Sequence, residues 1–349
     1  MKLGLNLGYW GAGNDADNLV LAQEADRLGF AVAWVAEAYG SDAPTVLAWV
    51  AAHTERIDIG SAIFQIPGRS PANCAMTAAT LDTLSGGRFR LGLGVSGPQV
   101  SEGWHGVRFD KPLARTREYV EIVELALSRQ KVRYEGSHYV LPLPDGPGKA
   151  LQLTVHPVRE HIPTYLAAVG PKNLELSGEL FDGWLAIFYS PEFAQDQLAS
   201  IAAGRAKVGK TLEGFDVVPS VPIVVGDDPR ACADPIRGHA ALYVGGMGSR
   251  DKNFYNQLAV RMGYDEAAAK VQDLYLSREY AAAAAAVPFE FLDQTALLGP
   301  KERIAEKMQD LARSGVTTLT LSPFVGDLEE RKAILRTAVE ALELAGVGD

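Results

Sequence analysis

Short apolar runs alternating with longer amphipathic runs constrain the fold of this chain more than any other sequence feature. Eight runs have the length and composition of buried strands, at residues 3–8, 31–36, 57–60, 89–95, 164–168, 183–188, 217–225 and 316–322. A predicted helix follows each of them, and such units give parallel sheets through right-handed crossovers. This count, in a chain of 349 residues, predicts an α/β fold, a closed (β/α)8 TIM barrel.

An open doubly wound sheet is the alternative for the same alternation. Such a sheet is expected to carry a Gly-rich dinucleotide-binding turn after its first strand. Residues 8–13 read Gly-Tyr-Trp-Gly-Ala-Gly, but the glycines have a different spacing, and Trp10 would obstruct a pyrophosphate. We therefore reject the open sheet.

Two stretches interrupt the alternation. Residues 131–160 contain a hairpin signature around Glu135-Gly136-Ser137, followed by a loop rich in Pro and Gly. Residues 230–290 form a helical stretch without a clear strand, which ends in six alanines. We expect a single domain over residues 1–349, with these two stretches as insertions in the barrel.

Composition excludes several classes of partner. The net charge is −10 and no basic block is present, which argues against nucleic acid. Cys74 and Cys232 cannot form a disulfide framework and lack zinc-ligand spacing, so we expect no metal site and a cytoplasmic protein. No apolar run is long enough to span a bilayer, and the N-terminus resembles a strand rather than a signal peptide.

In a barrel, function lies on the loops that follow the carboxyl ends of the strands. After the third strand come the small residues Gly60, Ser61 and Ala62, and then a turn rich in Pro and Gly. Small residues at this place suggest a platform on which a ligand approaches the backbone. A loop that merely needs glycine for its geometry remains the other interpretation.

Three further features point to the same loops. The turn at residues 168–171 opens a helix with Pro171 and Asn173 in its first turn, which indicates an anion site or, equally, ordinary capping. Glu37 and Glu102 are carboxylates near the mouth, or else solvated surface groups. Aromatic and amide side chains in the loops suit a flat heterocycle, unless they merely cap the barrel: Tyr9, Trp10, Tyr39, Phe64, Gln65, Gln99, Trp104, Phe188 and Tyr189.

Several strings resemble the bacterial luciferase-like superfamily, and within it the branch that uses the deazaflavin coenzyme F420. The matching strings are Ile57-Asp58-Ile59-Gly60-Ser61-Ala62-Ile63, Leu81-Asp82-Thr83-Leu84-Ser85-Gly86-Gly87-Arg88-Phe89, Leu91-Gly92-Leu93-Gly94-Val95, Ile162-Pro163-Thr164-Tyr165-Leu166-Ala167-Ala168 with Gly170-Pro171, and Asp182-Gly183-Trp184. The resemblance runs from about residue 3 to residue 325. The Ser-Gly-Gly-Arg-Phe string is fairly specific to the superfamily but does not separate deazaflavin users from users of FMN.

The resemblance implies a barrel with its coenzyme at the carboxyl-terminal mouth. It places a cis non-prolyl peptide bond at Ala62-Ile63, where a bulge after Ser61 would support the ring. The implied phosphate contacts are Ala167, Ala168, Val169 and Gly170. A second coenzyme segment is Val95, Ser96 and Gly97, and the acidic residue after the second strand is Glu37.

The chain departs from two subgroups of that branch. Sugar-phosphate and alcohol dehydrogenases carry a His where this chain has Ala38, and the sugar-phosphate enzymes carry a Glu at the position of Gly97. Methylene-pterin reductases have an acid in the first strand, where Asn6 stands. The catalytic set of neither subgroup is therefore complete here.

The resemblance implies an enzyme, an F420-dependent oxidoreductase that moves a hydride between C5 of the deazaflavin and a small organic substrate. Glu37, Glu102 and His105 are the candidates for proton transfer. An FMN-dependent monooxygenase fed by a separate reductase is the alternative with the same fold, and a barrel that binds coenzyme without turnover is another. A homodimer is typical of the family.

Overall fold

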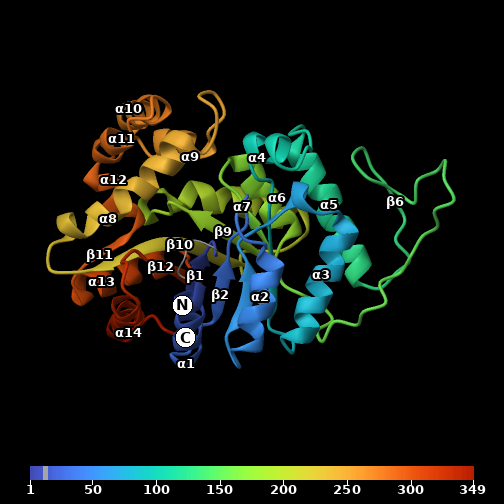
Figure 1. Ribbon diagram of the computed structural model, residues 1–349, viewed down its shortest axis with the longest axis horizontal. Helices are drawn as coiled ribbons and strands as arrows, with labels where there is room; N and C mark the ends of the chain where they lie inside the picture. Colours follow the sequence, from blue (N-terminus) through green and yellow to red (C-terminus); the bar gives the residue numbers. More distant parts are fainter. Residues whose placement is uncertain (11–14) are drawn as a thin grey trace.

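The computed structural model describes residues 1–10 and 15–349, and in it eight parallel strands close into a barrel (Figure 1). Neighbouring strands follow the order β1, β2, β3, β5, β8, β9, β10, β12, and β12 pairs with β1 to close the ring. Their bounds are β1 Lys2–Gly8, β2 Val32–Val35, β3 Asp58–Ser61, β5 Phe89–Gly94, β8 Thr164–Ala167, β9 Gly183–Ile187, β10 Asp216–Val225 and β12 Thr318–Pro323. The predicted barrel is confirmed. Gly11 and Gly13 of the rejected dinucleotide turn lie outside the described residues.

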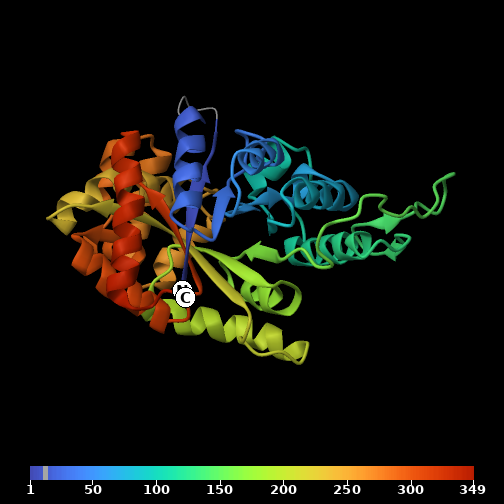
Figure 2. The same ribbon diagram turned by 90° about the horizontal axis from the view of Figure 1, so that it is seen from below.

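Helices cover the outside of the barrel between successive strands (Figures 1 and 2). They are α1 Asp15–Arg27, α2 Ala43–Ala52, α3 Pro71–Leu84, α4 Pro98–Gly103, α5 Pro112–Leu127, α6 Pro171–Leu180, α7 Ala194–Lys207, α13 Lys301–Arg313 and α14 Leu328–Ala345. Several begin with a side-chain cap: Asp42 accepts from the Thr45 N–H, and Ser70 from the Asn73 N–H. Such caps satisfy amide groups that the first helical turn leaves free.

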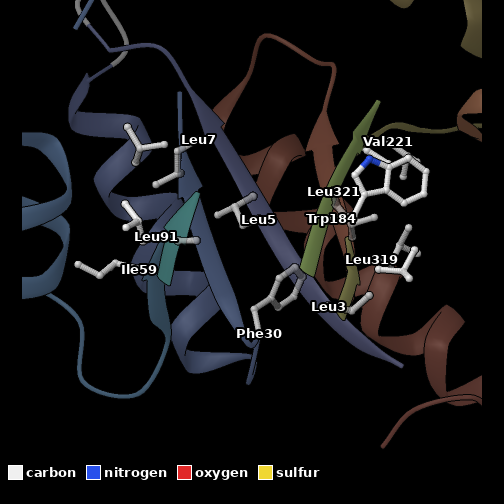
Figure 3. Packing of buried hydrophobic residues seen from close by; sticks show 14 of the residues in the cluster. Leu3, Leu5, Leu7, Phe30, Ile59, Leu91, Trp184, Val221, Leu319 and Leu321 are labelled. Carbon is white, nitrogen blue, oxygen red and sulfur yellow. The ribbon is translucent and has the colours of Figure 1, made fainter. Parts of the chain in front are cut away.

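Strand parity divides the buried side chains into two groups. Leu3, Leu5 and Leu7 alternate along β1 and point outward, where they join the layer between strands and helices (Figure 3). The barrel interior instead holds a small cluster around Val32, Trp34, Tyr165 and Val218, with the Trp34 and Tyr165 rings edge to face at 5.2 Å. This cluster closes the barrel to passage, as expected of a barrel of this size.

Polar groups occupy the two ends of the interior. Near the amino ends of the strands, Arg90 pairs with Asp58 at 2.8 Å and with Asp216 at 3.4 Å, and Tyr165 donates to Asp216 at 3.0 Å. Near the carboxyl ends, the Asn6 amide donates to Ser322 at 3.0 Å and to Ser220 at 3.3 Å. Asn6, Ser220 and Ser322 thus form the floor of the barrel mouth.

Two additions lie where the sequence indicated insertions. The hairpin β6 Tyr134–Glu135 and β7 Val140–Leu141 belongs to an arm that extends away from the barrel (Figures 1 and 2). Helices α8 Pro229–Ala241, α9 Phe254–Arg261, α10 Asp265–Leu276, α11 Tyr280–Ala286 and α12 Phe289–Thr295 form the second addition, with an apolar core of their own.

Sequence reasoning missed several short elements, among them α4 in the loop after β5. Strand β11, Leu297–Gly299, pairs with the carboxyl-terminal part of β10, and β4, Phe64–Gln65, pairs with the end of β5. Helix α12, Phe289–Thr295, begins at the end of the predicted helical stretch and continues past it. Strands of two or three residues carry too little periodicity to be recognised from sequence.

Candidate functional site

The bulge after β3 is held by a buried serine. The Ser61 hydroxyl donates to the Gly92 carbonyl at 2.8 Å and accepts from the Gly92 N–H at 2.9 Å. The peptide bond between Ala62 and Ile63 is cis, as the resemblance implied. A side chain on Gly94 would collide with Ile63, and Ala167 lies beside it. Ile63, Gly94 and Ala167, from three segments, therefore form one apolar seat at the mouth, which we call the Ile63 seat.

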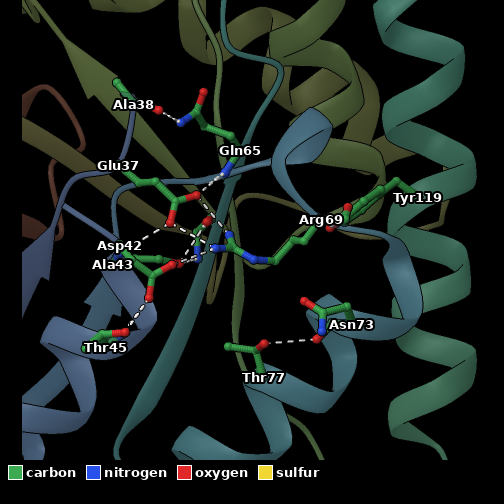
Figure 4. A network of polar contacts seen from close by, with 12 residues as sticks. Glu37, Ala38, Asp42, Ala43, Thr45, Gln65, Arg69, Asn73, Thr77 and Tyr119 are labelled. Carbon is green, nitrogen blue, oxygen red and sulfur yellow. Dashed lines mark hydrogen bonds and ion pairs between the residues drawn. The ribbon is translucent and has the colours of Figure 1, made fainter. Parts of the chain in front are cut away.

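Glu37 lies behind the bulge, in an ion pair that is almost fully buried (Figure 4). Arg69 donates to both carboxylate oxygens at 2.9 Å, and the backbone N–H groups of Ala43 and Gln65 each donate at 3.2 Å. The Glu37 and Arg69 side chains are only 9% and 10% exposed, and the Arg69 guanidinium covers the Phe64 ring at 4.5 Å. The Glu37 carboxylate thus joins the end of β2 to α2 and β4, with its acceptor positions occupied.

The segment after β5 turns sharply into α4. Ser96 has a left-handed backbone (φ 61°), which a residue with a Cβ rarely adopts outside functional turns, and Gly97 precedes the first turn of α4. Glu102 lies on the exposed side, where it accepts from the Phe109 N–H at 3.0 Å. His105 packs against the turn at Ile66–Gly68, and its Nε2 is buried without a partner among the described residues.

The amino end of α6 follows β8 and presents free donors. Among the described residues, the N–H groups of Val169 and Gly170 have no backbone partner, and a Cβ on Gly170 would meet nothing within 4 Å. The Arg261 guanidinium lies beside this turn and donates to the Val169 carbonyl at 3.1 Å. Ala168 is buried, and its carbonyl accepts from the Trp184 indole at 2.8 Å. Free amides, a helix amino end and a nearby cation favour an anion.

An aromatic wall closes the opposite side of the mouth; of its rings, sequence reasoning predicted Phe188 and missed those of His239, Tyr243, Tyr255 and Phe324. His239 of α8 lies 4.7 Å from the Tyr243 ring and 5.0 Å from Phe324, the residue after β12. Tyr243 lies 4.9 Å from Tyr255 of α9 and 5.9 Å from Phe188, the residue after β9. Because Phe188 and Phe324 follow strand ends, these rings lie over the carboxyl end of the barrel.

Two of the aromatic residues predicted to line the mouth are buried elsewhere in the structure. Tyr189 is fully buried, and its hydroxyl bonds to Ser314 at the end of α13, so it faces the outer layer. Phe64 is also fully buried, beneath Arg69. A signal for the wall was present, since His239 and Tyr243 are four residues apart and therefore share a helix face.

The structure thus brings most of the predicted coenzyme residues to one end of the barrel. Ser61, Ala62 and Ile63 lie beside β5, Val95 to Gly97 extend that strand, and Ala167 to Gly170 extend β8. The loop after β5 also reaches the helical addition, where the Phe109 and Phe254 rings are 6.5 Å apart. Glu37, Glu102 and His105 do not form one cluster: each lies in a different set of contacts.

A (β/α)8 barrel with a partly polar floor at its mouth, an apolar seat on one side and a turn with free N–H groups after the next strand has the features of barrels that bind small molecules at this end. Comparisons with known proteins agree with this class. Residues 9–318 match the model of the luciferase-like monooxygenase family. The chain belongs to this family.

Named relatives and a solved structure cover nearly the whole chain. A putative coenzyme F420-dependent oxidoreductase of Mycobacterium tuberculosis is 44% identical over 92% of this chain and 95% of its own length. A 5,10-methylenetetrahydromethanopterin reductase of Archaeoglobus fulgidus is 28% identical over 89% of this chain and 90% of its own. The structure of the coenzyme F420 dependent tetrahydromethanopterin reductase from Methanopyrus kandleri superposes with a TM-score of 0.83 at 23% identity, covering 99% of both chains.

Within the described residues, 1–10 and 15–349, no helix has the length and apolar character needed to cross a membrane. No group of three or more His, Cys, Asp or Glu side chains in that part of the chain is arranged to hold a metal ion.

Proposed function

We propose that this protein is an oxidoreductase that uses coenzyme F420 to transfer a hydride between C5 of the deazaflavin and a small organic substrate. The observation that carries the proposal is the Ile63 seat, an apolar surface of Ile63, Gly94 and Ala167 beside a turn with free N–H groups. The relative from Mycobacterium tuberculosis, with its F420-dependent name and 44% identity, supports this choice of coenzyme. When bound, the deazaflavin supplies or accepts the hydride; the protein supplies position and a shielded surface.

The residues present fit the phosphate of such a coenzyme. The free N–H groups of Val169 and Gly170 would donate to phosphate oxygens, and Arg261 would add positive charge beside them. The space beside Gly170 is open, so an anion has room against the backbone. Ala167 and Ala168 would hold the near side of that group, and Val95, Ser96 and Gly97 would border the coenzyme on the β5 side.

The three predicted proton carriers differ in what they are free to do. Glu37 already accepts four hydrogen bonds, so we infer that it positions the Ala62-Ile63 bulge rather than moving a proton. Glu102 orders the loop at Phe109 from an exposed position. His105 has an unpartnered ring nitrogen among the described residues and is the candidate of the three for proton transfer.

An FMN-dependent monooxygenase remains the competing function, because the family model includes monooxygenases and the anion turn suits either coenzyme. Calorimetric titration of the purified protein with F420 and, separately, with FMN decides between them. We expect F420 to bind much more tightly. Tight binding of FMN with weak F420 binding would overturn the proposal.

Gly170→Ala makes this titration specific to the site. Its Cβ meets no neighbour and φ is −86°, so the variant should fold normally but crowd the phosphate and weaken F420 binding about tenfold. Gly146→Ala, in the projecting arm, is the matched control and should bind as wild type. Equal affinities for the two variants would place the phosphate elsewhere.

We also propose that the protein is a homodimer, in which an apolar face of α2 and α3 meets its copy. Trp49 and Met76 are each 53% exposed on this face, and a hollow lined by Trp10, Val46, Ala48 and Trp49 runs along α2. Exposed apolar patches of this kind mark interfaces. Light scattering should give a dimer for wild type and a monomer for Trp49→Lys; a monomeric wild type would refute it.

Compartment and domain organisation complete the proposal. Both cysteines are free and buried, which fits the cytoplasm. We propose that barrel, arm and helical addition, residues 1–349, act as one domain. A single cooperative transition in thermal unfolding would support this, and two separate transitions would refute it.

A further inference from the structure

The aromatic wall contains polar side chains as well as apolar rings, and apolar packing alone would not require the polar ones. His239, Tyr243 and Tyr255 come from α8, from the π-helical segment Leu242–Gly246 and from α9, and they meet over the barrel mouth. Wide π-helical turns interrupt regular helices mainly at functional sites. Phe188, which packs edge to face against Tyr243, has a left-handed backbone (φ 50°), a second local departure from regular geometry at the same place.

The polar atoms of this wall are free. Within the described part of the chain, no hydrogen bond involves the His239 ring nitrogens or the Tyr243 and Tyr255 hydroxyls, although His239, Tyr243 and Tyr255 are all partly buried. Two half-buried tyrosines elsewhere do have protein partners: Tyr264 donates to Gln294 at 2.8 Å, and Tyr134 to Glu121 at 2.5 Å, whereas the hydroxyls of Tyr139 and Tyr275, like those of the wall, have none among the described residues. These polar atoms are not among the fully buried ones, so they are accessible from the mouth and available to a ligand there.

The free hydroxyls also converge. Ionisation of Tyr9 would raise the pKa of both Tyr243 and Tyr255, after the larger effect of burial, so these three groups lie within electrostatic reach of one another. Tyr9 follows β1 and is 44% exposed. Tyr9 therefore lies near the Tyr243–Tyr255 pair, whose rings are 4.9 Å apart.

The three polar side chains of the wall, His239, Tyr243 and Tyr255, are uncharged at neutral pH. Burial alone lowers the pKa of His239, to about 4, and burial and neighbouring tyrosines raise the pKa of Tyr255 to about 12 and that of Tyr243 further. At neutral pH the wall is uncharged: a neutral imidazole and un-ionised phenols. An anionic substrate would lose its hydration here without gaining a counter-charge.

We propose that this wall is the substrate site and that it selects an uncharged carbonyl compound with a flat or cyclic hydrocarbon body. The rings of Phe188, Tyr243 and Phe324 would contact the body, and the tyrosine hydroxyls would donate to the carbonyl oxygen. This inference rests on the proposed function, because it names the substrate of the same mouth. It separates the chain from enzymes for phosphorylated sugars, which need positive charge around the substrate.

The test is calorimetric binding of three probes of similar shape to the purified protein, with and without F420. 2-Acetonaphthone has the neutral carbonyl, 2-naphthoate replaces it with an anion, and 2-ethylnaphthalene lacks it. We expect the ketone to bind about tenfold more tightly than either of the others. Naphthoate binding as tightly as the ketone would overturn the proposal.

Variants locate the binding site. Tyr243→Phe and Tyr255→Phe keep the rings, and each should weaken ketone binding about three- to tenfold through the loss of one hydrogen bond. Tyr134→Phe, in the hairpin, is the matched control and should bind as wild type. If both wall variants bind the ketone as tightly as wild type, the inference is overturned even though F420 binds. If wild type does not bind F420, the proposed function is refuted, and the ketone titrations still decide whether the wall binds a substrate.

Discussion

Polar side chains on the two sides of the barrel mouth differ in whether they have hydrogen-bond partners in the protein. On the side of β2, β3 and β5, Glu37 and Ser61 make every hydrogen bond that their positions allow, with Arg69 and Gly92. On the side of α8 and α9, His239, Tyr243 and Tyr255 make no side-chain hydrogen bonds in the described part of the chain. The first side is scaffold, and the second is available to a ligand. Polarity near a mouth therefore indicates a binding role only where protein partners are absent.

The comparison predicts that breaking the saturated side destabilises the fold. Glu37→Gln leaves the buried Arg69 guanidinium without its bidentate partner, and we expect a loss of about 3 to 5 kcal/mol in the free energy of unfolding. Urea denaturation measures it. Glu102→Gln, which alters an exposed carboxylate with one backbone contact, should change stability by less than about 0.5 kcal/mol. Equal effects of the two substitutions would contradict the scaffold role of Glu37.

On the side of α8 and α9, we expect pH to change the stability of the fold by an intermediate amount. His239 has a folded pKa of about 4 because burial disfavours its cation, against 6.5 in the unfolded chain. The unfolded state therefore binds the proton first, so the stability contributed by this group is complete above pH 6.5 and is lost as pH falls toward 4. The loss amounts to at most about 3 kcal/mol.

Thermal unfolding between pH 7 and pH 4 checks this effect. The His239→Gln variant should lose less stability on acidification than wild type, and His53→Gln, at an exposed position, should follow wild type. Parallel pH profiles for wild type and His239→Gln would show that the imidazole is not buried as described.

A smaller loss is expected at the bulge. Ser61→Ala removes a fully buried hydroxyl that bonds to both the N–H and the carbonyl of Gly92. We expect a cost of about 1 to 3 kcal/mol in denaturant unfolding. A neutral substitution would mean that Gly92 finds other partners and that the bulge does not depend on Ser61.

The smallest effect should come from the tyrosine hydroxyls. Tyr243→Phe removes a group without a protein partner among the described residues, so its free energy of unfolding should stay within about 0.5 kcal/mol of wild type. Chemical denaturation of the variant measures it. A clear loss of stability would reveal a hidden internal partner and would remove the contrast between the two sides.

The features that could be predicted from the sequence are those set by neighbouring residues along the chain. Eight strands, the hairpin, the helix starts at Pro171 and Lys301 and the position of the cis bond at Ala62-Ile63 follow from periodicity, turn residues or the resemblance. Long-range partners were beyond it: Arg69 is 32 residues from Glu37, and no local pattern connects them. The aromatic wall, apart from Phe188, was missed for the same reason, because helices and strand ends far apart in sequence supply its rings.

The most direct test of the account is a crystal structure with F420 bound. We predict that the deazaflavin ring lies on Ile63, with its phosphate at the N–H groups of Val169 and Gly170. The Tyr243 and Tyr255 hydroxyls should remain free on the other face, leaving space for a substrate. A coenzyme that takes those hydroxyls for itself, or whose phosphate lies away from α6, would contradict the division of the mouth into scaffold and substrate wall.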